Sequence, residues 1–324
     1  MRKELRDRTK FLFLVFFILI CLVSCASRGT AQAEEYYSIG MAYFELGKYA
    51  EASMWLNRAR STDKTMLASE YNLGRIAFET GRYKEAAAYF ENLLKKDSDN
   101  VMTLKAAAYS RIKSGDFEKA EAHYSKVLEL IPENANDGFN YALVLYGLKK
   151  YEDCEKVLKN YPSALEEKAP SVLLLARAQR EMNKVEAIDT FAKWSILNAG
   201  APNQQGFYDY AKVLEKAEFY ARALEQYDAA INAQTSAKEA LKKYTIRFEK
   251  SRLLLTIDPD NEAGLKEFSA AVNEGFSDIA AIEALLLDKR IKKNYKDEIE
   301  KILNDIKSKI DEEDDDSLDD TTDL

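Results

Sequence analysis

A single histidine, His123, restricts the chemistry that this chain can perform. Metal sites built from paired histidines are excluded, and any nucleophile–histidine pair would have to use this one imidazole. Cys154 is one candidate nucleophile, but no third residue is evident that would orient such a pair. Its place among small residues in a predicted helix favours buried packing instead. We therefore expect no catalytic residues and no metal site.

Glycines and carboxylates, which often carry chemistry, have ordinary explanations in this sequence. The glycines recur at predicted helix contacts and turns, so none forms a phosphate-binding loop. Pairs of Glu and Lys are frequent, and on exposed helix faces they are expected to be solvated charges. We predict a non-enzymatic protein with no cofactor and no small-molecule substrate.

The charge of the chain is unevenly distributed. Residues 1–24 carry five basic and two acidic side chains, whereas residues 311–324 carry nine acidic side chains and no basic one. The body between them is nearly neutral, so it offers no electrostatic footprint for nucleic acid. The acidic end has no glycine, which a calcium loop requires, and it lacks apolar periodicity. It is predicted to be a disordered acidic tail.

Residues 1–24 have the pattern of an export signal. Basic residues precede an apolar stretch from Phe11 to Val23, and small residues follow it. As a helix this stretch would span about 20 Å, less than the roughly 30 Å hydrocarbon core of a membrane. An uncleaved N-terminal membrane anchor is the alternative interpretation. Both interpretations place the body outside the cytoplasm and at a membrane.

The sequence Leu22-Val23-Ser24-Cys25 resembles the lipobox of bacterial lipoproteins. The resemblance implies that Cys25 becomes lipidated and is the N-terminus of the mature protein, followed by a short tether at 25–32. Two or more acyl chains would give lasting attachment to a membrane. This predicts a protein that is exported and lipid-anchored, on the periplasmic side or the cell surface, with the leaflet left open.

The body has a period of 34 residues, which indicates one helical unit repeated along the chain. With few Gly and Pro residues, the composition favours helix nearly throughout. Units at 33–66, 67–100, 101–134, 135–168 and 169–202, then 204–237 after a shift of one residue, give about six repeats over 33–237. Each unit is expected to be two antiparallel helices with close contact at small residues. The repeated positions are Gly40, Gly74 and Ala108; Gly47, Gly81 and Gly115; Tyr49, Tyr83, Phe117 and Tyr151; Ala52, Ala86, Ala120 and Cys154; and Leu56, Phe90, Tyr124 and Leu158.

These units resemble the tetratricopeptide repeat. The resemblance rests on Leu73-Gly74, on the spacing of Tyr83, Ala86 and Phe90, and on Pro132. It implies an all-α, right-handed superhelical solenoid of antiparallel helix pairs. The fourth unit has Lys149 in place of the turn glycine. The repeated positions of the second helix correspond to Val185, Ile188 and Ala192 in the fifth unit. In the sixth unit they correspond to Tyr220, Ala223, Tyr227 and Ala230.

Residues 238–310 are interpreted as a divergent helical region that caps the repeats. The last helix of this region shows an apolar stripe at Ile299, Ile302, Leu303, Ile306 and Ile310. Solenoids need atypical end elements to cover their open end. A separate functional domain is the alternative.

In tetratricopeptide repeat proteins the first helix of each pair lines a concave groove, so the resemblance implies a partner-binding surface. Asn72 and Asn140 share one repeat position, where an amide could hold a ligand backbone group. The alternative is that several of the aromatic residues pack between successive helices. The candidate groove residues are Tyr37, Met41, Phe44, Tyr71, Asn72, Arg75, Phe78, Tyr109, Phe139, Asn140 and Tyr146, extended by Lys105, Ile112, Leu143, Arg177, Arg180, Tyr208 and Lys212.

The sequence thus predicts a membrane-anchored scaffold or adaptor in the bacterial cell envelope that binds a peptide or helix of a partner protein. The alternative function is a component of an envelope machine for outer-membrane protein assembly, pilus biogenesis or solute transport.

Overall fold

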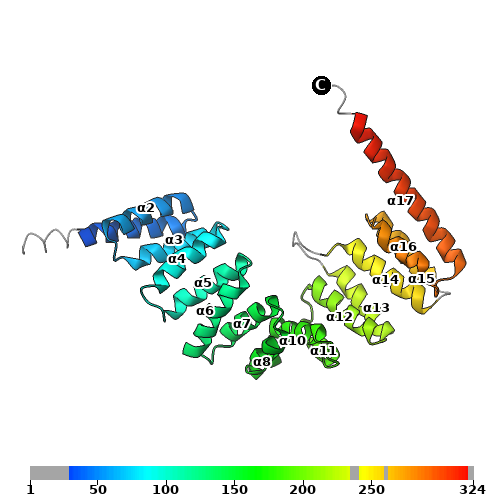
Figure 1. Ribbon diagram of the computed structural model, residues 1–324, viewed down its shortest axis with the longest axis horizontal. Helices are drawn as coiled ribbons and strands as arrows, with labels where there is room; N and C mark the ends of the chain where they lie inside the picture. Colours follow the sequence, from blue (N-terminus) through cyan, green and yellow to red (C-terminus); the bar gives the residue numbers. More distant parts are fainter. Residues whose placement is uncertain (1–28, 234–240, 259–261, 320–324) are drawn as a thin grey trace, which may run out of the picture. The chain divides into compact units, whose positions relative to one another are not determined.

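The computed structural model describes residues 29–233, 241–258 and 262–319, with side chains described as far as residue 310 (Figure 1). Within these ranges all regular structure is helical, which confirms the all-α prediction. No helix in the described ranges is long and apolar enough to cross a membrane. The predicted signal segment, and Cys25 with it, lie outside the described residues.

The chain divides into two compact units between Tyr161 and Pro162. Unit 1 begins with a helix at 29–45. Its other helices are α2 (Tyr49–Thr62), α3 (Leu67–Glu79), α4 (Tyr83–Leu94), α5 (Val101–Lys113), α6 (Phe117–Leu130), α7 (Ala135–Gly147) and α8 (Tyr151–Lys159).

Unit 2 starts with the short helix α9 (Pro162–Glu167). The helices that follow are α10 (Ala169–Glu181), α11 (Ala187–Leu197), α12 (Gln204–Lys216), α13 (Tyr220–Asn232), α14 (Lys243–Ile257), α15 (Glu262–Asn273), α16 (Ile279–Leu287) and α17 (Lys293–Asp319). Within each unit, most helices pack chiefly on the next helix in the chain.

The helices of a pair approach closely where the first one carries a small residue. A Cβ atom added at Gly74 would lie 2.8 Å from the ring of Phe90, and one at Gly40 would lie 2.8 Å from Leu56. Phe90 and Leu56 are almost fully buried, so there is no space for a larger residue at either glycine. The small and large positions of the 34-residue pattern are therefore the contact between paired helices.

The turn inside each pair has the same backbone conformation in all six predicted repeats. One residue per turn has a positive φ, between +55° and +78°. Glycine relieves the steric cost of this conformation, but only three of the turns use it. The six residues are Gly47, Gly81, Gly115, Lys149, Asn183 and Glu218.

The fifth repeat departs from the predicted register. The 34-residue spacing places Val185 at the repeated position of Tyr151, but its side chain is 75% exposed. The core positions belong instead to Ala187 and Phe191, which are 1% and 0% exposed. The register is wrong here because the core residues Ala187 and Phe191 follow the positive-φ residue Asn183 by four and eight positions, whereas the equivalent core residues of the other repeats follow theirs by five and nine.

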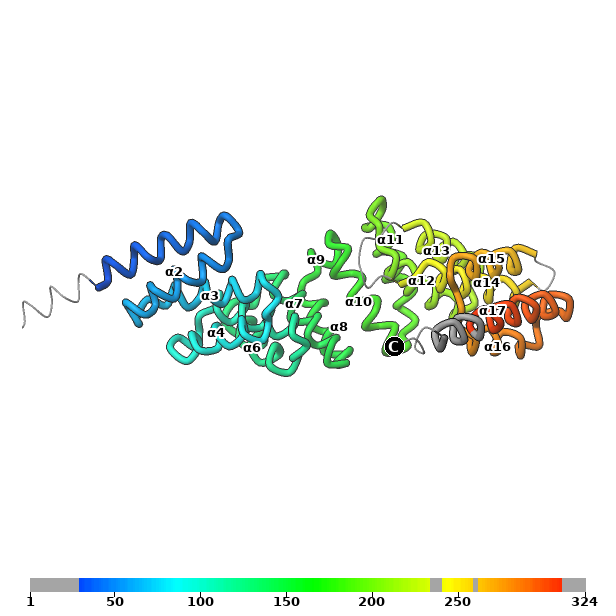
Figure 2. Tube along the Cα trace, turned by 90° about the horizontal axis from the view of Figure 1, so that it is seen from above, coloured from blue at the N-terminus to red at the C-terminus, as the bar shows by residue number. Residues whose placement is uncertain are grey.

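Residues 238–310 contain a further helix pair that the periodicity did not reveal. Helices α14 and α15 lie side by side in both views (Figures 1 and 2). A Cβ atom added at Gly264 on α15 would lie 2.7 Å from Leu255 on α14. Gly264 is followed four residues later by the fully buried Phe268, which repeats the small–large spacing of the earlier pairs. These helices share a core with α16 and α17.

The C-terminal end also differs from the prediction. The acidic tail was expected to be disordered from residue 311, whereas α17 continues to Asp319. Extending an existing helix costs far less than nucleating one, so acidic residues can remain helical at the end of a long helix. Residues 320–324 lie outside the described part of the chain.

Candidate partner-binding groove

Two hollows adjoin on the first helices of the repeats in unit 1. The first, of about 360 Å³, lies among the helix at 29–45, α3, α4 and α5. It combines apolar and aromatic side chains with few charges. Its lining residues are Tyr37, Met41, Leu67, Ala68, Tyr71, Asn72, Arg75, Leu93, Asp97, Asn100, Met102 and Thr103.

The second hollow, of about 780 Å³, continues the first toward α7. Tyr71 and Met102 line both hollows, so the two form one groove. Met102 and Tyr109 are 59% and 41% exposed, which makes them the most accessible large apolar side chains of this surface. The lining residues of the second hollow are Tyr71, Val101, Met102, Lys105, Ala106, Tyr109, Tyr124 and Asn140.

The structure thus brings together Tyr37, Met41 and Tyr71 with Asn72 and Arg75 in the first hollow, as the list of candidates anticipated. Met102 is a groove residue that sequence reasoning missed. The signal was available, since Met102 stands in the first turn of α5, a helix already expected to line the groove. Phe139 is half-buried and lines neither hollow.

Three of the predicted groove aromatics line neither hollow and pack within their own helix pairs. Phe44, Phe78 and Tyr146 each contact the aromatic residue that begins the second helix of the same pair. The ring centres are 5.7 Å apart for Phe44–Tyr49, 5.2 Å for Phe78–Tyr83 and 5.4 Å for Tyr146–Tyr151. Contacts of this kind contribute more than burial alone.

Phe78 has a second role, because it also stacks on Tyr109 with ring centres 5.3 Å apart. The stacked ring of Phe78 therefore holds the partly exposed ring of Tyr109 in place. A fixed aromatic surface loses little conformational entropy when it binds a partner.

Asn72 is committed to contacts inside the unit. Its Nδ2 donates to the Tyr37 hydroxyl at 3.0 Å and to the carbonyl of Ala68 at 2.9 Å. Its Oδ1 accepts from Arg75 at 3.0 Å. The Arg75 guanidinium in turn lies 4.4 Å from the centre of the Phe44 ring. Both amide protons of Asn72 are thus used to fix Tyr37 and the helix, and a ligand would have to displace one of these contacts.

Lys105, which lines the second hollow, forms an ion pair with a buried carboxylate. Lys105 Nζ lies 2.8 Å from Oδ2 of Asp137, whose residue is 1% exposed. The buried Tyr124 also lines this hollow. Burial, followed by the charge of Asp137, raises the pKa of Tyr124, so this hydroxyl remains a neutral hydrogen-bonding group.

The residues best suited to catalysis are engaged elsewhere. Burial lowers the pKa of His123, whose Nε2 lies 3.5 Å from Oε1 of Glu91. Cys154 is fully buried, as predicted, and burial raises the pKa of its thiol to about 12. A protonated, inaccessible thiol is not a nucleophile. Among the described residues, no group of three or more His, Cys, Asp or Glu side chains could hold a metal ion.

The cations predicted to extend the groove into the fifth and sixth repeats are paired within unit 2. Arg177 and Arg180 both bind the buried carboxylate of Asp209, each at 2.7 Å. Lys212 contacts Glu249 at 3.1 Å. Tyr208 packs edge-on against the buried Tyr227, with ring centres 6.0 Å apart. The arginine and lysine contacts connect α10 with α12 and α12 with α14, which are the first helices of successive pairs, whereas the Tyr208–Tyr227 contact lies within the pair of α12 and α13.

Two segments of the chain, residues 33–64 and 71–138, match models of the tetratricopeptide repeat. No curated protein matches this chain. A solved tetratricopeptide repeat protein from Parabacteroides merdae is similar, with a TM-score of 0.59 and 19% identity over 79% of this chain and 98% of that one. The C-terminal part of a repeat-containing protein from Cytophaga hutchinsonii gives a TM-score of 0.53 and 16% identity over 65% of this chain and 87% of that one.

The predicted fold class is confirmed, because the chain has the fold of tetratricopeptide repeat proteins. This repeat is a protein-interaction fold, whose stacked units create extended binding surfaces.

Proposed function

We propose that this protein is a non-enzymatic scaffold that binds a peptide or helix of a partner protein in the groove of unit 1. The observation that carries the proposal is the continuous surface around Tyr71, Met102 and Tyr109. Aromatic and Met side chains are enriched at protein interfaces, and exposed apolar surface of this kind is typical of a binding site.

The chemistry of the groove suggests the kind of segment it binds. Its accessible side chains are apolar or aromatic, while Arg75 and Lys105 already have partners inside the unit. Apolar anchor residues of the partner, rather than its charges, are therefore expected to supply most of the affinity. An amphipathic helix or an extended segment with alternate apolar residues meets this requirement.

We further propose that the scaffold is exported and attached to a bacterial membrane through lipid on Cys25, so that it recruits its partner in the cell envelope. The support is the resemblance of residues 22–25 to a lipobox and the basic and apolar stretches before it. A component of an envelope assembly or transport machine is the alternative. The groove fits both functions, and the identity of the partner separates them.

The groove is tested by crosslinking in intact membranes followed by identification of the captured proteins. We expect the double variant Met102→Ser, Tyr109→Ser to lose a specific partner while keeping its helical content. Both side chains are exposed, so their removal should leave the fold intact. Apolar interface anchors typically contribute more than about 1 kcal/mol each.

The matched control is Met54→Ser with Leu130→Ser. Both residues are similarly exposed, at 45% and 41%, but they lie on α2 and α6 and line neither hollow. If the groove variant captures the same partners as the control, the groove is not the binding surface. The anchor is tested separately, because Cys25→Ser should prevent incorporation of labelled fatty acid and release the protein from membranes.

A further inference from the structure

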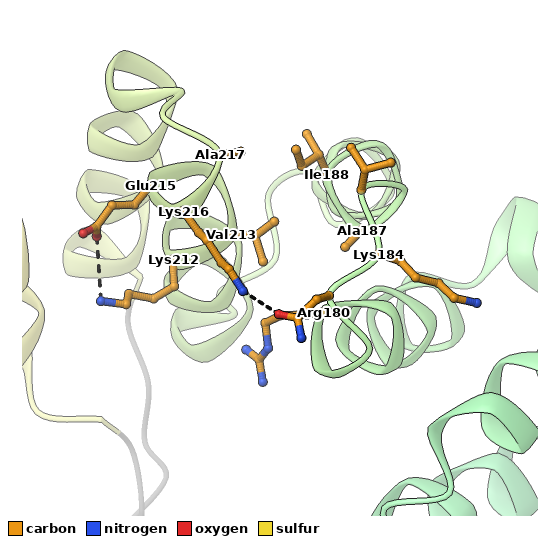
Figure 3. Close-up of a pocket in the computed structure, with 11 residues that line it drawn as sticks. Arg180, Lys184, Ala187, Ile188, Lys212, Val213, Glu215, Lys216 and Ala217 are labelled. Atoms are coloured by element: carbon orange, nitrogen blue, oxygen red, sulfur yellow. Dashed lines mark hydrogen bonds and ion pairs between the residues drawn. The ribbon is translucent and has the colours of Figure 1, made fainter.

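Unit 2 contains a pocket of about 500 Å³ between α11 and α12, but its charged rim is engaged within the unit. Arg180 binds Asp209, and Lys216 is hydrogen-bonded to the side-chain oxygen of Asn183 (Figure 3). Lys212 is paired with carboxylates as well. Polar groups that are available to a partner lie instead on the first helix pair of unit 1.

Two aromatic side chains of this pair lie outside its core. The rings of Tyr36, in the helix at 29–45, and Trp55, in α2, have centres 5.6 Å apart. Both side chains are half-buried, and neither belongs to the core cluster around Leu56. Each ring therefore presents part of its surface to the surroundings of the molecule.

The polar groups beside these rings are not used inside the described part of the chain. No described residue accepts a hydrogen bond from the indole N–H of Trp55. The exposed guanidinium of Arg58 lies 4.6 Å from the centre of the Trp55 ring and forms no ion pair with a described residue. Trp and Tyr are enriched where a membrane meets water, and a long cationic side chain beside them can reach the phosphates of the headgroups.

The charge around the rings is nearly balanced. Glu34 and Glu35 are exposed on the helix at 29–45, and they offset the positive charges of Arg58 and Lys64. A contact with phospholipid at this place is therefore expected to depend on the two rings more than on net charge.

The proposed lipid anchor lies close to the rings along the chain. Residues 26–28 separate Cys25 from Gly29, where the first described helix begins. The four steps from Cys25 to Gly29 reach at most about 14 Å when fully extended. Tyr36 follows Gly29 by seven residues, which is about 10 Å along a helix. Lipid on Cys25 thus holds Tyr36 within about 25 Å of the membrane surface.

We propose that the first helix pair rests on the membrane that holds the anchor, with the rings of Tyr36 and Trp55 among the phospholipid headgroups and Arg58 against their phosphates. This inference rests on the proposed lipid anchor at Cys25. The anchor supplies the attachment, and the helix pair fixes the orientation of unit 1. Since Tyr37 lines the first hollow, the groove then opens close to the bilayer.

The test uses the protein purified from bacterial membranes with its lipid attached. It is placed in vesicles of phosphatidylethanolamine and phosphatidylglycerol that contain phospholipid brominated near the glycerol end of its acyl chains. Bromine quenches a tryptophan that it contacts, and the chain has two tryptophans. Trp194 is fully buried, so the lipid cannot reach it. We expect the emission of the wild-type protein to be quenched, and the quenching to persist when salt is added.

Two variants locate the contact. Trp55→Phe keeps a ring at this place but leaves Trp194 as the only tryptophan, so its emission should not be quenched. The matched reporter adds Tyr109→Trp to Trp55→Phe. Tyr109 is 41% exposed and also has a cation over its ring, Lys113, but it belongs to the third repeat. A tryptophan at 109 should therefore remain unquenched.

Absence of quenching in the wild-type protein would overturn the proposal, and the two rings would then only cover the end of the repeats. Equal quenching of Trp55→Phe, or of the reporter at 109, would overturn it as well. Labelled fatty acid distinguishes this failure from failure of the anchor. Label on Cys25 without quenching of Trp55 refutes the membrane contact alone, whereas absence of label refutes both the anchor and the contact.

Discussion

At the scale of single residues, the turn inside each helix pair keeps a positive φ even where the residue is not glycine. Lys149 and Glu218 have φ angles of +61° and +62°, although both carry side chains that disfavour this conformation. Three other turns use glycine for the same purpose. Because both side chains are exposed, nothing in the packing requires lysine or glutamate at these positions.

We therefore predict that Lys149→Gly and Glu218→Gly stabilise the protein. A left-handed conformation costs a residue with a side chain about 1–2 kcal/mol, while the added freedom of glycine in the unfolded chain costs about 0.5–1 kcal/mol. Each substitution should thus add about 0.5–1 kcal/mol to the free energy of unfolding, measured by urea denaturation. The reverse substitution Gly115→Ala, at φ +78°, should destabilise. Equal stability of all these variants would show that the turns do not retain this conformation in solution.

At the scale of helices, the period of the sequence predicted the pairs because each pair repeats the same small–large contact. Gly74 with Phe90 and Gly40 with Leu56 are contacts of this kind, and both were in the pattern. The pattern failed at α11, because the core residues of that helix lie one position closer to the positive-φ residue of the turn than in the other repeats. It also missed α14 and α15, where glycine stands in the second helix of the pair and faces Leu255.

The contact between the fifth and sixth repeats offers a test of such packing. A Cβ atom added at Gly206 on α12 would lie 2.5 Å from the indole of Trp194, which is fully buried. Overpacking of a core typically costs about 1–3 kcal/mol, and the better helix propensity of alanine returns up to about 1 kcal/mol.

We expect Gly206→Ala to lower the free energy of unfolding by about 1–2 kcal/mol in urea denaturation. Gly29→Ala is the control, since a Cβ atom there would meet nothing within 4 Å. A Gly206→Ala protein as stable as the control would mean that Trp194 moves aside freely.

At the scale of the whole molecule, each unit has its own core and contains one of the two tryptophans, Trp55 in α2 and Trp194 in α11. In repeat proteins each helix pair depends mainly on its neighbours. Gly206→Ala should therefore destabilise unit 2 more than unit 1. In protein labelled with fluorotryptophan, fluorine NMR during urea unfolding should show a large shift of the Trp194 midpoint and a smaller one for Trp55. Equal shifts would mean that the chain unfolds as a single cooperative block.

The candidate site was less predictable than the fold. Resemblance to a repeat indicates which helices line a groove, and Tyr71 and Tyr109 were found in this way. It does not indicate which side chains are used internally. Asn72 and Phe78 stand at positions expected to face a ligand, yet their contacts with Tyr37 and Tyr83 hold the helices together.

The pairing of most helices with the next one in the chain has a consequence for how the protein reaches this structure. Chains whose contacts are local in sequence close only short loops, and they fold much faster than chains with distant contacts. Each pair can form its own contacts as soon as both helices are available. A nascent polypeptide of this kind can begin to fold from its first repeats while its end is still being synthesised.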